Sequence, residues 1–342
     1  MSEPQWIDAL ARFVDGELGI EGPLRAERVL GGQSNPTWYV DAGGERLVLR
    51  MQPHGELLPS AHALDREFRI LRALENTGVP VPRALRYSDD RSIVGTPFYI
   101  MERLDGRVFP AASLQGVLPE ERRAMYRSAA ETLAKLHGVD WHRAGLGDFG
   151  RHGEYFARQV RRWSRQWEGS KQRDIPELDR LIAWLPEHLP RQEETTICHG
   201  DYRFGNLMFA PSSPQIVGVL DWELSTLGDP LADLGFFCMF YHLDASYAGV
   251  ADLNLLELGI PSEAEFVAEY NRAAGKNRTL EPFHVAFAFF RFAVIFAGIE
   301  DRARRGNAAD PEAAARSGGR AAVFAKLACE RLGVAGGGTK PE

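Results

Sequence analysis

Ile197-Cys-His-Gly-Asp-Tyr-Arg-Phe-Gly-Asn206 is the most informative stretch of this 342-residue sequence. Asp201 closely follows a histidine in it, and Asn206 closes the stretch. Phosphoryl transfer requires a carboxylate that orients the acceptor hydroxyl and takes its proton, together with metal ligands that neutralise phosphate charge. Both kinds of residue stand here on one short polar stretch. We therefore predict Asp201 as a catalytic base and Asn206 as a metal ligand.

A second acidic segment, Val219-Leu-Asp-Trp-Glu223, comes soon afterwards. Its apolar residues predict a short strand that ends at Asp221, where a carboxylate would complete a Mg²⁺ site with Asn206. Taken singly, such an aspartate is more often a turn residue or a helix N-cap. The order and spacing of the whole set favour catalysis instead.

The two segments resemble the signature of the aminoglycoside phosphotransferase and choline kinase type of protein-kinase-like enzymes, which is H-G-D-x-x-x-x-N followed by D-W-E. The resemblance covers nearly the whole chain, and it implies ATP as donor, Mg²⁺ as metal and a small hydroxylated molecule as acceptor. The stretches Leu57–Ala63 and Leu224–Leu234 resemble one branch, which is fused to acyl-CoA dehydrogenase domains in eukaryotes and stands alone in bacteria. That branch implies phosphorylation of a hydroxyacyl-CoA hydroxyl, with a CoA thioester as the candidate partner.

The first hundred residues predict a small antiparallel β lobe with one main helix. Gly43-Gly44 stands between two β-rich runs, which is a hairpin signal. Ser60 is a candidate N-cap for the main helix. The expected elements are a helix over 6–19, strands over 24–30, 37–41 and 46–51, a helix over 60–76, and strands over 83–87 and 97–102.

The rest of the chain predicts a larger, mostly helical lobe. The fold class is therefore α+β, a bilobal protein-kinase-like fold, with a nucleotide-binding lobe over 1–104 and a catalytic, acceptor-binding lobe over 105–342. A chain of this length is expected to form more than one compact unit. Helices are expected over 119–137, 153–168, 176–188, 230–242, 262–274, 282–305 and 311–332.

The nucleotide site is expected at three places in the small lobe. In the stretch 31–35, Gly32, Ser34 and Asn35 would cover the phosphates with backbone N–H groups, although such a stretch alone is commonly a hairpin turn. Kinases hold the phosphates with a strand lysine that pairs with a helix glutamate. The first 134 residues contain no lysine, so Arg50 is the candidate for the strand and Glu67 for the helix. The alternative for Arg50 is a solvated edge-strand residue.

The third place is the link between the lobes. Pro97–Leu104 is expected to form the last strand and the hinge, where backbone groups from Glu102 to Leu104 would contact the adenine. A plain strand and linker is the alternative interpretation.

Other polar residues favour structural roles. Asp229 followed by Pro230 is typical of a helix N-cap and first turn. We expect Asp233 to brace the catalytic loop and His199 to be its structural partner. The histidines at 137, 142 and 152 lack the tight spacing of a metal site.

Composition excludes several classes of function. The hydrophobic fraction of 44% and charged fraction of 25% are typical of a globular protein rather than a disordered one. The net charge of −7 gives no basic field for nucleic acid. The three scattered cysteines and an N-terminus without an apolar signal region favour a cytoplasmic protein. The apolar run Phe283–Gly298 is expected to be a buried helix and not a membrane span.

The acceptor is the open question, with three candidates. The first is an anionic hydroxylated metabolite such as a hydroxyacyl-CoA, the second a cationic aminoglycoside antibiotic, and the third no acceptor at all, in a nucleotide-binding pseudokinase. Helical spacing places four arginines on one face, which favours an anion, although a solvated arginine face is the common alternative. The segment contains Arg151, Arg158, Arg161, Arg162, Arg165 and Arg173, and the four arginines on one face are 158, 161, 162 and 165.

Whether the protein is a monomer or a homodimer stays open.

Overall fold

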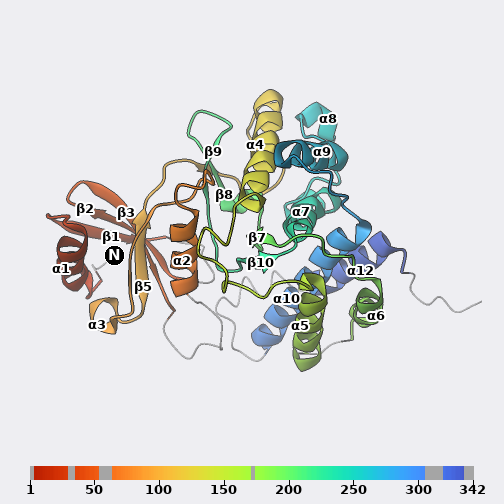
Figure 1. Ribbon diagram of the computed structural model, residues 1–342, viewed down its shortest axis with the longest axis horizontal. Coiled ribbons are helices and arrows are strands. Elements are labelled where there is room, and N and C mark those ends of the chain that lie inside the picture. The colour runs from red at the N-terminus through yellow and green to blue at the C-terminus, as the bar shows by residue number, and fades with distance from the viewer. Residues whose placement is uncertain (1–3, 30–34, 54–63, 171–173, 305–318, 335–342) are drawn as a thin grey trace, which may run out of the picture.

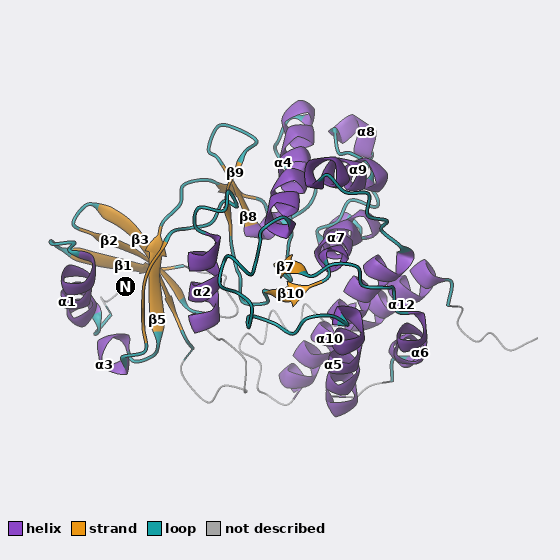
Figure 2. Ribbon diagram, viewed as in Figure 1, coloured by secondary structure: helices purple, strands orange, loops and turns teal. Residues whose placement is uncertain are grey.

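The computed structural model describes residues 4–29, 35–53, 64–170, 174–304 and 319–334. The chain forms a smaller lobe, built from a sheet and few helices, and a larger lobe that is mostly helical (Figures 1 and 2). This arrangement confirms the predicted α+β kinase-like fold. The predicted catalytic loop, residues 197–206, lies in the larger lobe, on the side that faces the sheet.

The smaller lobe is a five-stranded antiparallel sheet in the order β1-β2-β3-β5-β4. Strands β2 and β3 form the predicted hairpin around Gly43-Gly44, where both glycines have positive φ. A Cβ on Gly43 would lie 2.2 Å from the Glu21 carbonyl oxygen, so the turn requires glycine. The strands are β1 (Leu24–Arg28), β2 (Thr37–Ala42), β3 (Glu45–Met51), β4 (Ala84–Ser88) and β5 (Phe98–Glu102).

Helices α1 (Ile7–Leu18) and α2 (Leu64–Leu74) lie on opposite sides of this sheet (Figure 1). Residues 47, 49 and 51 of β3 pack in the apolar core under α1. Side chains alternate along a strand, so Arg50 points to the other face, toward α2. The buried stripe of α2 consists of Leu64, Glu67, Ile70, Leu71 and Leu74, at helical spacing. Glu67 is its one charged member, which places a carboxylate inside the lobe.

The larger lobe is organised around α10 (Pro282–Arg304), which packs against α5, α7 and α12. Two small β ladders flank the predicted catalytic loop: β10 pairs with β7, and β8 pairs with β6 and β9. The helices are α4 (Pro119–His137), α5 (Tyr155–Ser170), α6 (Pro176–Trp184), α7 (Pro230–Cys238), α9 (Glu263–Ala274), α10 and α12 (Arg320–Leu332); the strands are β6 (Arg107–Val108), β7 (Thr196–Cys198), β8 (Leu207–Phe209), β9 (Ile216–Val219) and β10 (Thr226–Gly228).

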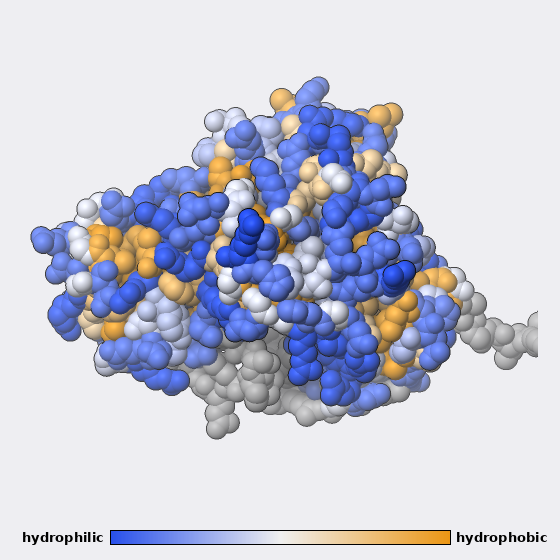
Figure 3. All heavy atoms as spheres, in the orientation of Figure 1, coloured by the Kyte–Doolittle hydropathy of each residue, from blue (hydrophilic) through white to orange (hydrophobic). Residues whose placement is uncertain are grey.

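Helix α10 is the one helix in the described part of the chain that is long and apolar enough to cross a membrane. Of its most apolar window, 72% is buried inside the protein, as is usual for a core helix. The face seen in Figure 3 is largely hydrophilic, with its apolar residues in small separate groups. The predicted buried helix over 282–305 is therefore present as expected.

The differences from the prediction are short elements set by local capping. Helix α3 (Arg91–Val94) was not predicted, and it begins where the Asp90 side chain accepts from the Ser92 N–H. Helix α8 (Leu255–Leu258) begins in the same way at Asn254. The predicted helix over 230–242 ends as an α-helix at Cys238 and continues as a 3₁₀ turn. Ser60, and the first residues of the helix predicted over 311–332, lie outside the described residues.

Candidate active site

The catalytic loop holds the Asp201 carboxylate from two directions. The Asn206 amide nitrogen donates to Asp201 Oδ2 at 2.7 Å and to the Asp201 carbonyl at 2.8 Å. Arg203 Nε approaches the same carboxylate oxygen at 3.4 Å. Because a single loop turn, Phe204–Asn206, brings Asn206 back over Asp201, the H-x-D and N parts of the motif meet in space. Asp201 Oδ1 keeps no hydrogen bond among the described residues.

The backbone ahead of Asp201 is held by Asp233. Its two carboxylate oxygens accept from the N–H groups of His199 (2.6 Å) and Gly200 (2.8 Å). The His199 ring accepts from the Asp201 N–H at Nδ1, and Nε2 donates to the Leu220 carbonyl at 2.9 Å. The predicted bracing role of Asp233 and the structural role of His199 are both confirmed. His199 also ties the catalytic loop to the segment that carries Asp221.

Gly200 has the left-handed backbone that the loop requires, with φ of +83°. A Cβ at this position would lie 2.6 Å from the Leu224 carbonyl oxygen. The H-G-D motif therefore requires glycine at this position for two physical reasons, the positive φ and the close approach of the Leu224 backbone. Both follow from the folding of the segment after Asp221 back over the loop.

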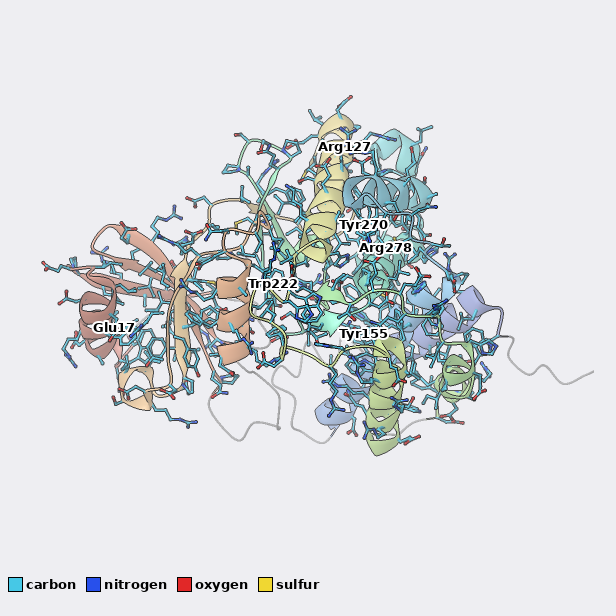
Figure 4. All side chains as sticks on the ribbon, viewed as in Figure 1. Glu17, Arg127, Tyr155, Trp222, Tyr270 and Arg278 are labelled. Atoms are coloured by element: carbon cyan, nitrogen blue, oxygen red, sulfur yellow. The ribbon has the colours of Figure 1, made fainter. Side chains whose placement is uncertain are left out.

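A buried polar chain continues from Asp233 to the surface of the larger lobe. Arg278 donates to the Tyr270 hydroxyl (2.7 Å), which donates to His137 Nδ1 (2.7 Å), and His137 Nε2 donates to Asp233 (3.3 Å). Tyr270 and Arg278 lie together near α7 in Figure 4. Burial lowers the pKa of His137, which keeps it a neutral donor. Burial alone would raise the pKa of Asp233, but its bond to His137 helps to hold that pKa below the ordinary value.

The other two histidines also have structural partners. His142 stacks on Trp141 with ring centroids 3.5 Å apart, and His152 meets the same ring at 4.7 Å. In the described ranges, the one cluster of candidate metal-binding side chains contains no histidine. The geometry thus agrees with the structural interpretation of all three histidines.

Arg50 joins the two lobes at the site. Its Nε lies 2.8 Å from Glu67 Oε2, and its Nη2 lies 2.7 Å from Asp221 Oδ1. The guanidinium therefore spans two carboxylates that come from α2 and from the end of β9. This contact rules out the alternative of a solvated edge-strand arginine. Burial alone would lower the pKa of Arg50, but the nearby acidic groups, Glu67 first, raise it above its ordinary value.

Glu67 is the centre of a second set of contacts. The Asn35 amide donates to Glu67 Oε1 at 3.0 Å, and the Tyr99 hydroxyl donates to Oε2 at 3.0 Å. Burial raises the pKa of Glu67, while Arg50 and Tyr99 oppose that rise. Asn35 was predicted to cover phosphate through its backbone, and its side chain is here a brace for Glu67. Gly32 and Ser34, predicted beside it, lie outside the described residues.

The oxygens near Asp221 fit a hard divalent cation. Glu67, Asp221 and Glu223 each place a carboxylate oxygen so that all three lie within 4.8 Å of one another. The Asn206 amide nitrogen is already used by Asp201, which leaves its side-chain oxygen for a cation. Carboxylate and amide oxygens are the ligands that Mg²⁺ prefers. Glu223 was not selected from the sequence, although the D-W-E pattern contains it.

The predicted hinge passes close to the strands that precede Asp221. A Cβ on Gly218 of β9 would lie 2.4 Å from Leu104 Cδ1, so the Leu104 side chain occupies the space that this glycine leaves. A Cβ on Gly106 would lie 2.4 Å from Met208 of β8. Glu102 ends β5, and its side chain approaches Arg83 at 3.7 Å. The hinge therefore lies against the β8–β9 hairpin, beside the catalytic loop.

Replacement of Arg50 tests its two contacts. We expect Arg50→Ala to raise the nucleotide KM or lower kcat and to destabilise the fold by about 3–5 kcal/mol, because Glu67 keeps a buried, unpaired carboxylate. Glu67→Ala should have a milder kinetic effect. Arg50→Lys should retain partial function, because lysine keeps the positive charge but lacks the planar guanidinium that contacts both carboxylates at once. Steady-state kinetics and thermal unfolding measure these effects.

The exposed strand arginine Arg86 provides the matched control. It pairs with a single carboxylate, Glu17, at the surface of the same sheet, so Arg86→Ala should change stability by less than about 1 kcal/mol. An Arg50→Ala protein with the kinetics and stability of the Arg86→Ala protein would contradict the assigned contacts.

Asp229 gives a prediction for pH. Its side chain caps α7 by accepting from the Leu231 N–H at 2.9 Å, as predicted, but burial raises its pKa to about 6. The folded state then binds more protons than the unfolded state between about pH 4 and 6, so this group lowers stability as pH rises through that window. Asp229→Asn keeps the cap without the charge.

We expect the Asp229→Asn protein to be about 1–3 kcal/mol more stable than wild type at pH 7.5, with a smaller difference at pH 5. Chemical denaturation at both pH values measures the difference. Equal gaps at the two pH values would show that Asp229 is not the titrating group.

A family model described as the phosphotransferase enzyme family matches residues 25–283. The chain belongs to this family. A crystal structure from Ralstonia eutropha JMP134, named as a proposed aminoglycoside phosphotransferase, superposes with a TM-score of 0.87 at 40% identity, covering 96% of this chain and 98% of that one. The aminoglycoside phosphotransferase APH(4)-Ia, in a complex with AMP-PNP and hygromycin B, shares the fold with a TM-score of 0.59 at 16% identity, over 93% of this chain and 98% of that one.

Curated relatives include larger proteins. Acyl-CoA dehydrogenase family member 10 from Mus musculus is 44% identical over 323 residues, which cover 92% of this chain and 30% of that protein. Acyl-CoA dehydrogenase family member 11 from Gallus gallus is 42% identical, over 84% of this chain and 38% of that protein. The chain thus spans about a third of the length of these relatives. Family and fold together identify a kinase-type phosphotransferase.

Proposed function

We propose that this chain transfers the γ-phosphoryl group of ATP, with Mg²⁺, to a hydroxyl of a small anionic metabolite such as a hydroxyacyl-CoA. The observation that carries the proposal is the pairing of Asp201 with Asn206 on one loop, beside the cluster of Arg50, Glu67 and Asp221. In this proposal, the base and the ligands for a metal–nucleotide complex come from these residues, which lie where the two lobes meet.

Each side chain has a defined task in this proposal. Asp201 Oδ1, which is free of hydrogen bonds among the described residues, accepts the proton of the acceptor hydroxyl as that oxygen attacks the γ-phosphorus. Asn206 and Arg203 hold the other carboxylate oxygen and fix its direction. Asn206 and Asp221, with Glu223 nearby, would hold Mg²⁺, which when bound neutralises charge on the phosphates. Arg50 supplies a fixed positive charge toward the nucleotide.

The acceptor is proposed from the charge of α5. Its first residue, Tyr155, packs against Gly228 of β10, so the start of the helix lies next to the strand pair that leads to the catalytic loop. Arg161 is largely exposed, and among the described residues the one carboxylate that its guanidinium approaches is that of Glu154, at 3.9 Å. Arg158 donates to the Arg151 and His152 carbonyls rather than to a carboxylate. Such a face would attract a phosphate or carboxylate and repel a cationic drug.

The names of the curated relatives support a CoA thioester as the acceptor class, because both are acyl-CoA dehydrogenase family members. A phosphorylation screen tests the proposal with purified protein, ATP and Mg²⁺, and hydroxyacyl-CoAs, free hydroxy acids and aminoglycosides as acceptors. We expect turnover on the hydroxyacyl-CoAs. Turnover on kanamycin-like drugs alone would favour an antibiotic kinase, and nucleotide binding without any transfer would favour a pseudokinase.

Charge reversal on α5 tests the acceptor site separately. The double variant Arg161→Glu, Arg162→Glu should raise the acceptor KM about tenfold at low salt and leave the ATP KM nearly unchanged, because steering acts on the acceptor and weakens with salt. The matched control is Arg123→Glu, Arg127→Glu on α4, also exposed; Arg127 lies at the top of the larger lobe in Figure 4, away from α5. Equal effects of the two double variants would contradict a specific anion site on α5.

A further inference from the structure

Arg291 of α10 is a buried arginine that contacts the catalytic loop. Only 8% of the residue is exposed, and its Nη2 donates to the Gly200 carbonyl. The guanidinium lies over the ring of Phe236 from α7, 5.1 Å from the ring centroid. No motif of the sequence includes it, because it stands in an apolar helix.

The charge of Arg291 has an unusual setting. Among the described residues no carboxylate forms an ion pair with it, and its Nε is enclosed without a hydrogen-bond partner. An unpaired buried charge costs several kcal/mol of desolvation unless other contacts offset it. The Gly200 carbonyl and the Phe236 ring are the contacts that this structure provides. Such a cost, at a position that contacts the catalytic loop, is consistent with a functional role for Arg291.

The contact acts on the peptide unit that precedes Asp201. The carbonyl of this Gly200–Asp201 unit accepts from Arg291, and its N–H donates to His199 Nδ1. On the other side of Gly200, Asp233 accepts from the N–H groups of His199 and Gly200. Opposite charges therefore hold opposite sides of Gly200, a residue whose glycine backbone would otherwise be the freest in the loop.

We propose that Arg291 is a positioning residue for Asp201. It sets the plane of the peptide bond that leads into Asp201 and so fixes the direction of the carboxylate. The proposal rests on the proposed role of Asp201 as base. In catalysis, a misplacement of about 1 Å can cost about 10²-fold in rate, which is the size of effect that this contact would prevent.

Hydrogen exchange of the catalytic loop tests the contact without any acceptor. In Arg291→Met the guanidinium is lost and the apolar stem is kept, and we expect the amides of Gly200 and Asp201 to exchange about tenfold faster than in wild type. Arg291→Lys keeps a charged donor and should give an intermediate rate. If Arg291→Met does not fold, Arg291→Lys alone decides, since unchanged exchange in that variant would contradict the need for a guanidinium.

Kinetics test the consequence for Asp201. Arg291→Met should lower kcat by about 10²-fold and leave the ATP KM within about twofold, because the nucleotide contacts lie elsewhere. Arg291→Lys should restore part of kcat.

The matched control is Arg122 of α4, another buried arginine that donates only to backbone carbonyls, those of Leu114, Val117 and Leu258. Arg122→Met should lower stability but leave kcat and the exchange of residues 197–206 unchanged. Unchanged loop exchange in Arg291→Met overturns the proposal, and so does faster exchange with full kcat. A wild-type protein that phosphorylates no acceptor would instead refute the proposed function, while the exchange measurement would still decide whether Arg291 orders the loop.

Discussion

Asp201→Asn is expected to lower kcat by about 10²–10⁴-fold, the usual contribution of a general base. The variant removes the proton acceptor but keeps an oxygen that accepts from Asn206 and Arg203 at the same place. The loop should therefore retain its shape, and nucleotide affinity should stay close to that of wild type. Steady-state kinetics and nucleotide calorimetry on the same preparation separate the two effects.

Asp229→Asn is the matched control for this change. It replaces a second aspartate of the same lobe by asparagine, but this buried side chain caps α7 and does not face the reacting groups. It should retain kcat. Near-normal kcat in Asp201→Asn would remove Asp201 from the role of base, whereas an equal loss in both variants would point to general damage of the lobe.

Loss of Asp221 or of the metal is expected to have the second large effect. Asp221→Ala should lower kcat by about 10³-fold or more, because the metal supplies several kcal/mol of charge stabilisation in the transition state. Excess chelator should stop the wild-type reaction, and Mg²⁺ or Mn²⁺ should restore it. Full activity in chelator would contradict the metal requirement.

The backbone at Asp221 calls for a second variant. Its φ is +64°, a conformation that asparagine and aspartate adopt more readily than alanine. Asp221→Asn therefore keeps the backbone and one oxygen while it removes the charge, and it should lose less activity than Asp221→Ala and recover further at high Mg²⁺. Equal losses, unaffected by Mg²⁺, would show that Asp221 acts through Arg50 alone and not through a metal.

The sequence by itself determined the features that depend on near neighbours along the chain. Strand alternation and helical spacing predicted most elements of both lobes, and the Asp229-Pro230 pair predicted the start of α7. The H-G-D-x-x-x-x-N spacing predicted that Asp201 and Asn206 meet, because a short loop returns the chain over such a distance. Capping and periodicity act over a few residues, so their signals can be seen in the sequence directly.

Only the tertiary structure decided which distant side chains share the site. Arg50 and Asp221 stand 171 positions apart, and Arg291 and Gly200 stand 91 apart. The sequence predicted a buried helix around Arg291, but no local pattern indicated what the arginine would contact there. Arg291 is buried against the catalytic loop because α10 packs against α7. That packing results from the whole apolar core. Contacts of this kind depend on the sum of many weak interactions, which no local pattern records.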